Sequence, residues 1–336
     1  MKDIPLAVVI ATKNRPREIE QYALASLERS DFRDFLCVVW DASDGDATQR
    51  IAEGGEWGFP LACVRAPRSG LPSQRNDAVE YVLEHHPCAR CFLFIDDDTE
   101  LSGDALSGLM ESFEDERVWG VNVPHVPRLP WTSAAGATPS PGAGVRIVTP
   151  CLYNRSVCPE PPGISVDWLS GCGMAFRREV FEELGLRFPE AFQRFGGYAL
   201  GEDVAASFYL KRKLGKELRN ALSGALRHHA AGGARLNVAG MVASKWYNFH
   251  LLFEAIYEGG AGPILKLKFK LFMIAAALKA LARARSLDLP SLIRGIGEAR
   301  RGLKEYHEKD DVRNLFRSHK TGPIEPNLNK GVHEHV

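Results

Sequence analysis

The chain has no excess of charge of one sign, because its 42 lysines and arginines equal its 42 aspartates and glutamates. This balance argues against a nucleic acid as the partner. The seven cysteines are an odd number, and no second CxxC pair follows Cys88 and Cys91 at zinc-finger spacing. We therefore expect reduced thiols rather than a disulfide framework, and we interpret the single pair as packing at the edge of a strand.

The chain also lacks an apolar run long enough to span a membrane. Its first apolar run is interrupted by Lys13 and Arg15 too early for a secretory signal, so we expect a cytoplasmic chain. Residues 263–285 are apolar, but the lysines within 266–270 break up the roughly 20 apolar residues that a span needs. Two interpretations stay open: a peripheral contact at the inner face of a membrane, or a helix packed on its own domain with its lysines in water.

The composition is that of an ordinary folded protein, with 45% hydrophobic and 25% charged residues. Single cores saturate at roughly 250 to 300 residues, so 336 residues allow one large domain and an appendage. The pattern changes to helices from about residue 231. We therefore predict a catalytic domain over 1–230 and a helical region over 231–336.

The first half alternates short apolar runs with amphipathic stretches, which is typical of βαβ units and predicts an α/β fold with a mostly parallel sheet flanked by helices. The predicted strands are 6–11, 35–40, 61–66 and 91–96, and the predicted helices begin near Pro16, Asp46 and Pro72. The strands are nearly continuous hydrophobic runs, as expected for strands covered on both faces.

Polar residues follow each of these strands, in the segments Thr12–Arg15, Asp41–Asp46 and Arg68–Gly70 and in the cluster that begins at Asp96. In open α/β sheets, ligands bind beyond the carboxyl ends of the strands. We therefore expect these four tails to converge on one crevice.

The second half is less regular. The stretch Pro124–Pro162 is rich in proline and glycine and predicts a long surface loop. The segments after it predict a strand or strand pair over Asp167–Phe176 and a helix over Arg177–Leu184. A second helix, opened by acidic residues, is predicted over Glu202–Leu214, and a strand-like run over Glu217–Leu226.

Asp96, Asp97 and Asp98 are consecutive aspartates at the end of a hydrophobic strand. Like charges at this spacing raise one another's pKa unless a cation neutralises them. Oxygen ligands of this kind suit Mg2+ or Mn2+, which complete their coordination with phosphate oxygens and water. The alternative is a solvated acidic turn before a helix that starts near Ser102.

Several motifs taken in order resemble the inverting GT-A glycosyltransferases of family 2, over roughly the first 230 residues. The motifs are VVIATKNRP, VVWDASDGD, GLPSQRNDAV, FIDDDTEL, SGCGMAFRREVF and LGEDV. The resemblance implies a Rossmann-like GT-A fold, a divalent Mn2+ or Mg2+ ion, and transfer of a sugar from a nucleotide-diphosphate donor (UDP, GDP or dTDP) to a hydroxyl acceptor.

The resemblance also implies roles for particular residues. Contacts with the nucleotide sugar fall to Thr12, Asn14, Arg15, Asp41, Arg75, Asn76, Asp96 and Asp97, metal ligation to Asp98 with Asp96, and catalysis to Asp203 with Glu202. Asp203 matches the general base that would remove the acceptor proton, and a single in-line displacement would invert the anomeric configuration. The alternative for this acidic pair is a helix start that complements the helix dipole.

Three further interpretations stay open beside plain structural ones. His228 or His229 could add a metal ligand, although a lone histidine is more often structural. Trp168 could stack on an acceptor sugar or belong to the core. Gly171 and Gly173 could let the acceptor approach the backbone or mark a bulge. The second tail, DASDGD, departs from the family's usual pattern, so the base of the nucleotide stays undetermined. The excursion over Pro124–Pro162 matches no one subfamily and leaves the acceptor open, and the sugar and any homo-oligomer also stay undetermined.

Three other functions share part of this pattern. A haloacid-dehalogenase-like phosphatase needs a threonine where Glu100 stands, and its nucleophile loop normally follows the first strand. A nucleotidyltransferase usually has a glycine-rich loop after its first strand, which ATKNRPRE lacks. A nucleotide-sugar binding protein without turnover remains the third, and retention of both acidic centres counts against it.

Overall fold

A central sheet forms the body of the molecule. The computed structural model describes residues 4–126, 146–196, 199–229, 237–283 and 288–317. Within them the main sheet has seven strands in the order β10-β6-β9-β4-β1-β2-β3. These are β1 (Leu6–Thr12), β2 (Phe35–Asp41), β3 (Leu61–Arg65), β4 (Cys91–Asp96), β6 (Val118–Asn122), β9 (Met174–Arg177) and β10 (Glu217–Asn220). Two small antiparallel sheets pair β5 (Thr99–Leu101) with β11 (Leu226–His228) and β7 (Arg146–Val148) with β8 (Asn154–Ser156).

The main sheet is mostly parallel, as predicted. β1 pairs in parallel with β2 and β4, β2 with β3, and β6 with β10, whereas β9 runs antiparallel to both β4 and β6. The chain builds β1, β2 and β3 in one direction and then returns to place β4 on the other side of β1. The strand order therefore reverses between β1 and β4, where α/β proteins commonly bind their ligands.

Helices cover both faces of the sheet because successive strand residues point to opposite sides. On one face, Val8 and Cys37 pack against η1 (Ile19–Leu24), α2 (Ala25–Glu28) and α5 (Ala105–Ser112). On the other, Val9 and Val38 pack against α4 (Leu71–His85), α6 (Arg178–Glu182) and α7 (Glu202–Arg212). The remaining short helices are α1 (Pro16–Glu18), α3 (Ala47–Gly54), η2 (Glu190–Phe195) and η3 (Val312–Asn314).

The four predicted amino-terminal strands and the helix starts near Pro16, Asp46 and Pro72 are confirmed within one residue. Three other predictions are corrected. β3 is an edge strand with mostly half-buried side chains, so it is not covered on both faces. The strand predicted over Asp167–Phe176 begins only at Met174, after an irregular turn. The predicted loop Pro124–Pro162 contains the β7–β8 hairpin, while its residues 127–145 lie outside the described residues.

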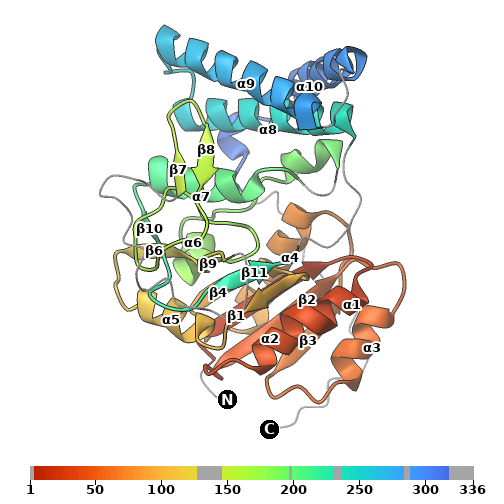
Figure 1. The fold of residues 1–336 in the computed structure, drawn as a ribbon, viewed down its shortest axis with the longest axis vertical. Coiled ribbons are helices and arrows are strands. Elements are labelled where there is room, and N and C mark those ends of the chain that lie inside the picture. The colour runs from red at the N-terminus through yellow and green to blue at the C-terminus, as the bar shows by residue number, and fades with distance from the viewer. Residues whose placement is uncertain (1–3, 127–145, 197–198, 230–236, 284–287, 318–336) are drawn as a thin grey trace.

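The carboxyl-terminal helices are α8 (Val238–Tyr257), α9 (Pro263–Arg283) and α10 (Leu289–Lys309). They gather at the end of the molecule opposite β1–β3, with α8 between the body that holds the main sheet and the outer two helices (Figure 1). Side chains of α7, such as Phe208, share a buried cluster with Tyr247 of α8 and Phe269 of α9. In the described part of the chain, no helix is long and apolar enough to cross a membrane.

Candidate active site

The polar tails of β1 and β2 meet at the carboxyl edge of the sheet, as predicted. The Asn14 side chain donates to Asp44 Oδ2 at 2.7 Å and accepts from the Asp44 backbone N–H at 2.9 Å. The side-chain amide of Gln74, from α4, donates to the carbonyl oxygens of Thr12 at 3.1 Å and Trp40 at 3.0 Å. Lys13 Nζ also reaches Ser69 Oγ of the third tail, at 3.3 Å. These contacts bring the tails of β1, β2 and β3 together, while the predicted crevice between them remains a prediction.

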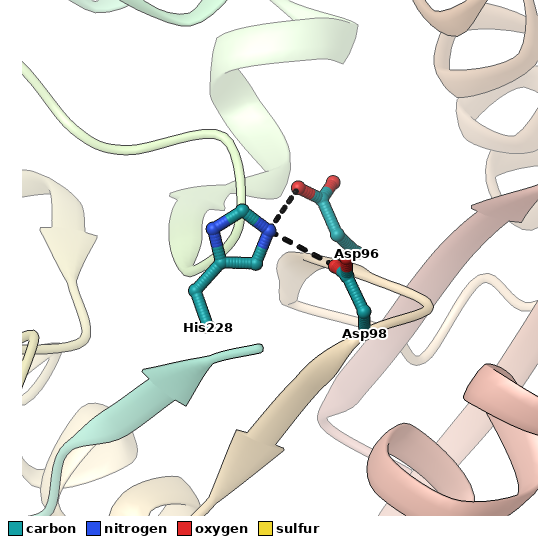
Figure 2. A group of neighbouring side chains, drawn as sticks. All are labelled: Asp96, Asp98 and His228. Atoms are coloured by element: carbon teal, nitrogen blue, oxygen red, sulfur yellow. Dashed lines mark ion pairs between the residues drawn. The ribbon is translucent and has the colours of Figure 1, made fainter. Parts of the chain in front are cut away.

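Asp96 and Asp98 lie beside His228, which reaches them from the end of β11 (Figure 2). His228 Nε2 is 2.9 Å from Asp98 Oδ1 and 3.8 Å from Asp96 Oδ2. One ligand atom from each of the three residues lies within 4.8 Å of the others, an arrangement that could hold a metal ion. The Asp98 side chain is only 4% exposed, whereas those of Asp96 and His228 are 30% and 35% exposed, so the group is open on one side.

The environment shifts the pKa values of these groups. The hydrogen bond with Asp98 raises the pKa of His228, because the carboxylate stabilises the charged imidazolium. Burial raises the pKa of Asp96 even though Arg75 acts in the other direction. A cation would relieve the crowding of these carboxylates, because it stabilises their charged forms.

Asp97 points toward the tail of β1. It accepts hydrogen bonds from Thr12 Oγ1 at 2.7 Å and from Arg15 Nη1 at 3.0 Å, and the same guanidinium nitrogen lies 3.4 Å from Asp98 Oδ2. Burial raises the pKa of Asp97 to about 6, although both of these hydrogen bonds lower it. Asp97 thus joins β1 to the end of β4, and Arg15 places a positive charge beside two carboxylates.

Arg75, from α4, links the two acidic centres. Its guanidinium donates to Glu202 Oε1 at 2.7 Å, to Asp96 Oδ1 at 3.1 Å and to the Gly171 carbonyl at 2.8 Å. Its side chain is 2% exposed, so these three hydrogen bonds are made inside the protein. The resemblance placed Arg75 near the donor, and the structure brings it into direct contact with Asp96.

Glu202 and Asp203 begin α7, where a negative charge also complements the helix dipole. Asp203 Oδ2 accepts from the Gly171 N–H at 2.9 Å and Oδ1 from the Val204 N–H at 2.7 Å. Glu202 is buried, and burial raises its pKa to about 8 even though Arg75 acts in the other direction. The two neighbours therefore differ: Glu202 holds Arg75, whereas Asp203 is less buried and fixed by backbone donors.

Several predicted site residues lie outside the cluster of Asp96, Asp98 and His228. Asp41 is buried and held by Ser43 and Arg65 at the end of β2. The side-chain amide of Asn76 is hydrogen-bonded to both the N–H and the carbonyl of Phe188. His229 is turned away from the carboxylates of Asp96 and Asp98. Its Nε2 lies 2.9 Å from Glu100 Oε2 and its ring stacks on Tyr22 at 3.8 Å, a position that does not support the predicted ligand role.

The predicted acceptor-side residues are mainly packed against neighbouring side chains. Trp168 is 8% exposed, and the Arg146 guanidinium lies over its ring at 4.3 Å. A Cβ on Gly173 would meet Leu226 at 2.1 Å, and one on Gly171 would meet both Arg75 and Glu202 at 3.3 Å. These glycines allow close internal packing, and the acceptor contacts predicted for all three residues remain predictions.

Sequence reasoning missed two side chains that shape the site. Gln74 ties β1 to β2, and Arg65 donates to Asp41 and to the carbonyl oxygens of Ser43 and Gly45. No local pattern marks either residue, because these partners in the strand tails lie 20 or more positions away along the chain.

Solved glycosyltransferase structures share this fold. A mannosyltransferase from Pyrobaculum calidifontis, PcManGT, in complex with GDP-Man and Mn2+, is 20% identical, with 90% of this chain and 82% of that chain covered and a TM-score of 0.52. S. aureus TarS is 17% identical, with 89% and 49% covered and a TM-score of 0.53. GalNAc-T7 with UDP, GalNAc and Mn2+ is 17% identical, with 84% and 58% covered and a TM-score of 0.53. The chain thus spans about half the length of the last two, and at these identities the likeness shows the fold alone.

No curated protein matches the chain. The family model of glycosyl transferase family 2 matches residues 7–185, which is more than half of the 336 residues and includes β1 to β4, α4 and the three consecutive aspartates. By this match, and in agreement with its GT-A-like fold, the chain belongs to glycosyl transferase family 2.

Proposed function

We propose that the chain is a metal-dependent, inverting glycosyltransferase that moves a sugar from a UDP, GDP or dTDP donor to a hydroxyl acceptor. The observation that carries the proposal is the group Asp96, Asp98 and His228, whose ligand atoms lie within 4.8 Å of one another at the carboxyl end of β4. This group adjoins the strand reversal between β1 and β4, the expected position for a nucleotide.

The residues present fit Mn2+ or Mg2+. Carboxylates suit both ions, and an imidazole beside them makes manganese the first ion to test, since Mg2+ prefers oxygen ligands. A bound cation would neutralise the charge that develops on the leaving diphosphate. The presence of Mn2+ with a nucleotide or nucleotide sugar in PcManGT and GalNAc-T7 supports the same type of donor complex here.

The donor would lie along the tails of β1, β2 and β4. Thr12 and Arg15 hold Asp97 and so define the wall of the donor site, while Asn14 fixes the β1 tail against Asp44 of the β2 tail. We assign Asp41 to the base or ribose and Asp96 to the ribose and sugar. We take Asp98 as the principal metal ligand, with His228 Nε2 beside its Oδ1 at 2.9 Å.

Asp203 would act as the general base. Its carboxylate is held by the N–H groups of Gly171 and Val204, so its position is fixed by backbone before an acceptor binds. The acceptor hydroxyl would give its proton to Asp203 while its oxygen forms a bond to the anomeric carbon. The bond from that carbon to the diphosphate oxygen breaks, and its electron pair leaves with the diphosphate. Attack opposite the leaving group inverts the configuration.

Calorimetry with UDP, GDP and dTDP sugars, with and without Mn2+, tests the donor half of the proposal. We expect one nucleotide class to bind in a metal-dependent way, and Asp98→Asn to weaken that binding by at least about tenfold, because a direct ligand is lost. Asp31→Asn is the matched control, since Asp31 is exposed and precedes β2 at the opposite edge of the sheet. Unchanged metal dependence in Asp98→Asn would overturn the assignment.

Asp203→Asn tests the catalytic half. General-base catalysis typically contributes about 100-fold to 10,000-fold, so transfer should fall by that factor while donor affinity stays the same. NMR of the product should show the inverted anomer. If the wild-type protein binds donors but never transfers or hydrolyses them with any acceptor class, it is a nucleotide-sugar binding protein instead.

A further inference from the structure

Helix α9 has two apolar faces. One face packs inward: Phe269, Met273 and Ala277 are 3%, 1% and 7% exposed, and Phe269 stacks on Phe253 of α8 at 4.2 Å between ring centroids. The other face carries large apolar side chains in water. These are Ile264 (71% exposed), Leu267 (57%), Leu271 (57%), Ile274 (50%) and Leu278 (56%), which we call the outer stripe.

The outer stripe is continuous. Its members are separated by three, four, three and four positions, so at about 100° per residue they fall within an arc of roughly 80°. From Ile264 to Leu278 the stripe is about 21 Å long, at 1.5 Å per residue. Single exposed leucines are ordinary, but an aligned row of five is the kind of patch that marks an interaction surface.

Lysines border the outer stripe on both sides. By the same helical spacing, Lys270 lies along one edge and Lys268 and Lys279 lie along the other, and all three are exposed. The sequence of α9, Pro263–Arg283, contains no aspartate or glutamate. Lysine stems can cover apolar surface while the ammonium groups reach outward, so this helix presents an apolar centre between two cationic borders.

A second copy of the chain is the weaker candidate for the partner. The three-four spacing also suits a coiled-coil seam, but such seams normally pair opposite charges at their borders. Two α9 helices facing each other would bring lysines against lysines, with no acidic residue on either helix to pair with them. An anionic lipid surface satisfies both features, because its headgroups attract the lysines and its acyl region accepts the apolar side chains.

We infer that α9 lies in the headgroup region of an anionic phospholipid bilayer, with the outer stripe inserted and the lysines against the headgroups. The helix would rest on the membrane and not cross it. α9 and α10 form the outermost layer at their end of the molecule, so the approach of a flat surface is not blocked by the sheet (Figure 1). The inference goes beyond the transfer reaction and rests on α9 alone.

Flotation of the full chain with lipid vesicles tests this. Two vesicle types are compared, phosphatidylcholine alone and phosphatidylcholine mixed with phosphatidylglycerol in equal parts. The wild-type protein should bind the mixed vesicles at least about tenfold more tightly than the neutral ones, and salt at roughly 0.5 M should weaken the binding. No binding to the mixed vesicles, or equal binding to both types, would overturn the inference.

Two variants and a control locate the contact. Leu267→Gln with Leu271→Gln removes apolar side chains from the stripe, and Lys268→Gln with Lys270→Gln removes charge from its borders. Each should reduce binding to the mixed vesicles by about tenfold or more. Leu184→Gln with Leu222→Gln is the matched control, since both leucines are exposed elsewhere, at 37% and 41%.

Further measurements separate the outcomes. Donor binding by calorimetry should be unchanged in the stripe variant, so loss of vesicle binding would be distinct from any failure of the proposed reaction. Sedimentation velocity should give the same mass for the wild-type protein and the stripe variant. A wild-type dimer that the stripe variant converts to a monomer would show that a second copy covers the stripe, and would overturn the inference.

Discussion

Two regions of the molecule depart from the usual distribution of side chains, and they do so in opposite ways. One is the group of carboxylates at the end of β4 and the start of α7, and the other is the outer stripe of α9. Charged side chains are normally in water and rows of large apolar side chains are normally buried. Asp97, Asp98 and Glu202 are nevertheless 5%, 3% and 5% exposed, while Leu267 and Leu271 are each 57% exposed. Burying carboxylates and exposing large apolar side chains both cost free energy of folding. A region with a purely structural role would not need to bear that cost.

The two regions differ in how the protein offsets that cost. The carboxylates are held by internal cations, because Arg75 contacts Asp96 and Glu202, and Arg15 contacts Asp97 and Asp98. The five side chains of the outer stripe are instead half or more exposed to water. The acidic site is thus organised before a ligand binds, whereas the stripe gains its apolar contacts only from a partner.

Removing the internal cation should have the largest effect on stability. Arg75→Met leaves Glu202 and Asp96 without their guanidinium and the Gly171 carbonyl without its donor. A buried acceptor left without its donor costs about 1–3 kcal/mol, and three acceptors lose theirs together, so urea unfolding should show a loss of about 3–5 kcal/mol. If Arg75→Met is as stable as the wild-type protein, the acidic site does not depend on its internal cation, and its contrast with the outer stripe fails.

Arg117→Met is the control for this prediction. Arg117 also pairs with a carboxylate, Asp115 at 2.9 Å, but its side chain is 83% exposed. Exposed ion pairs contribute little because water and salt screen them. The unfolding midpoint of this variant should stay at the wild-type value, which would assign the effect at Arg75 to burial.

The second prediction concerns pH. Burial raises the pKa of Glu202 from 4.5 to about 8, so the folded chain holds this proton over a range in which the unfolded chain has lost it. The stability that Glu202 contributes is therefore complete below pH 4.5 and is lost as the pH rises through 8. Glu202→Gln removes this titration. Without metal or donor, the Tm of the wild-type protein should fall relative to the variant by on the order of 5 °C between pH 5 and pH 8.

Glu111→Gln removes an exposed carboxylate from α5 and serves as the matched control. Asp97 is present in every one of these proteins, and its pKa is set by burial, Thr12 and Arg15, so its titration cancels in the difference. A Tm difference between the wild-type protein and Glu202→Gln that does not change with pH would mean that Glu202 is charged throughout, like an ordinary member of an ion pair with Arg75.

The contrast between local and long-range information explains which parts of the fold the sequence could predict. β1, β2 and β4 are continuous apolar runs followed by polar tails, and these signals lie within a few residues. β9 was placed less well, because its position between β4 and β6 depends on partners more than 50 positions away. β3 reads like the other strands, and only its place at the sheet edge leaves it half exposed.

The same limit applies to the site. The sequence could not choose between His228 and His229, since adjacent strand residues point to opposite sides and the register decides. The pairing of β11 with β5 sets His228 opposite Thr99. In this register the His228 side chain reaches Asp98, and the His229 side chain reaches Glu100. On α9 the sequence could not choose the buried face, because both faces are apolar.

The smallest expected effect belongs to the outer stripe. Leu271→Ala removes a side chain that is already 57% exposed, so the free energy of unfolding without lipid should change by no more than about 0.5 kcal/mol. Met273→Ala, two positions along on the packed face, removes a side chain that is 1% exposed and should cost about 2–5 kcal/mol. Urea unfolding of the two variants measures the difference directly. Equal losses would mean that the stripe is covered within the folded chain. The acidic site and the outer stripe would then no longer differ in whether their contacts come from inside the protein or from a partner.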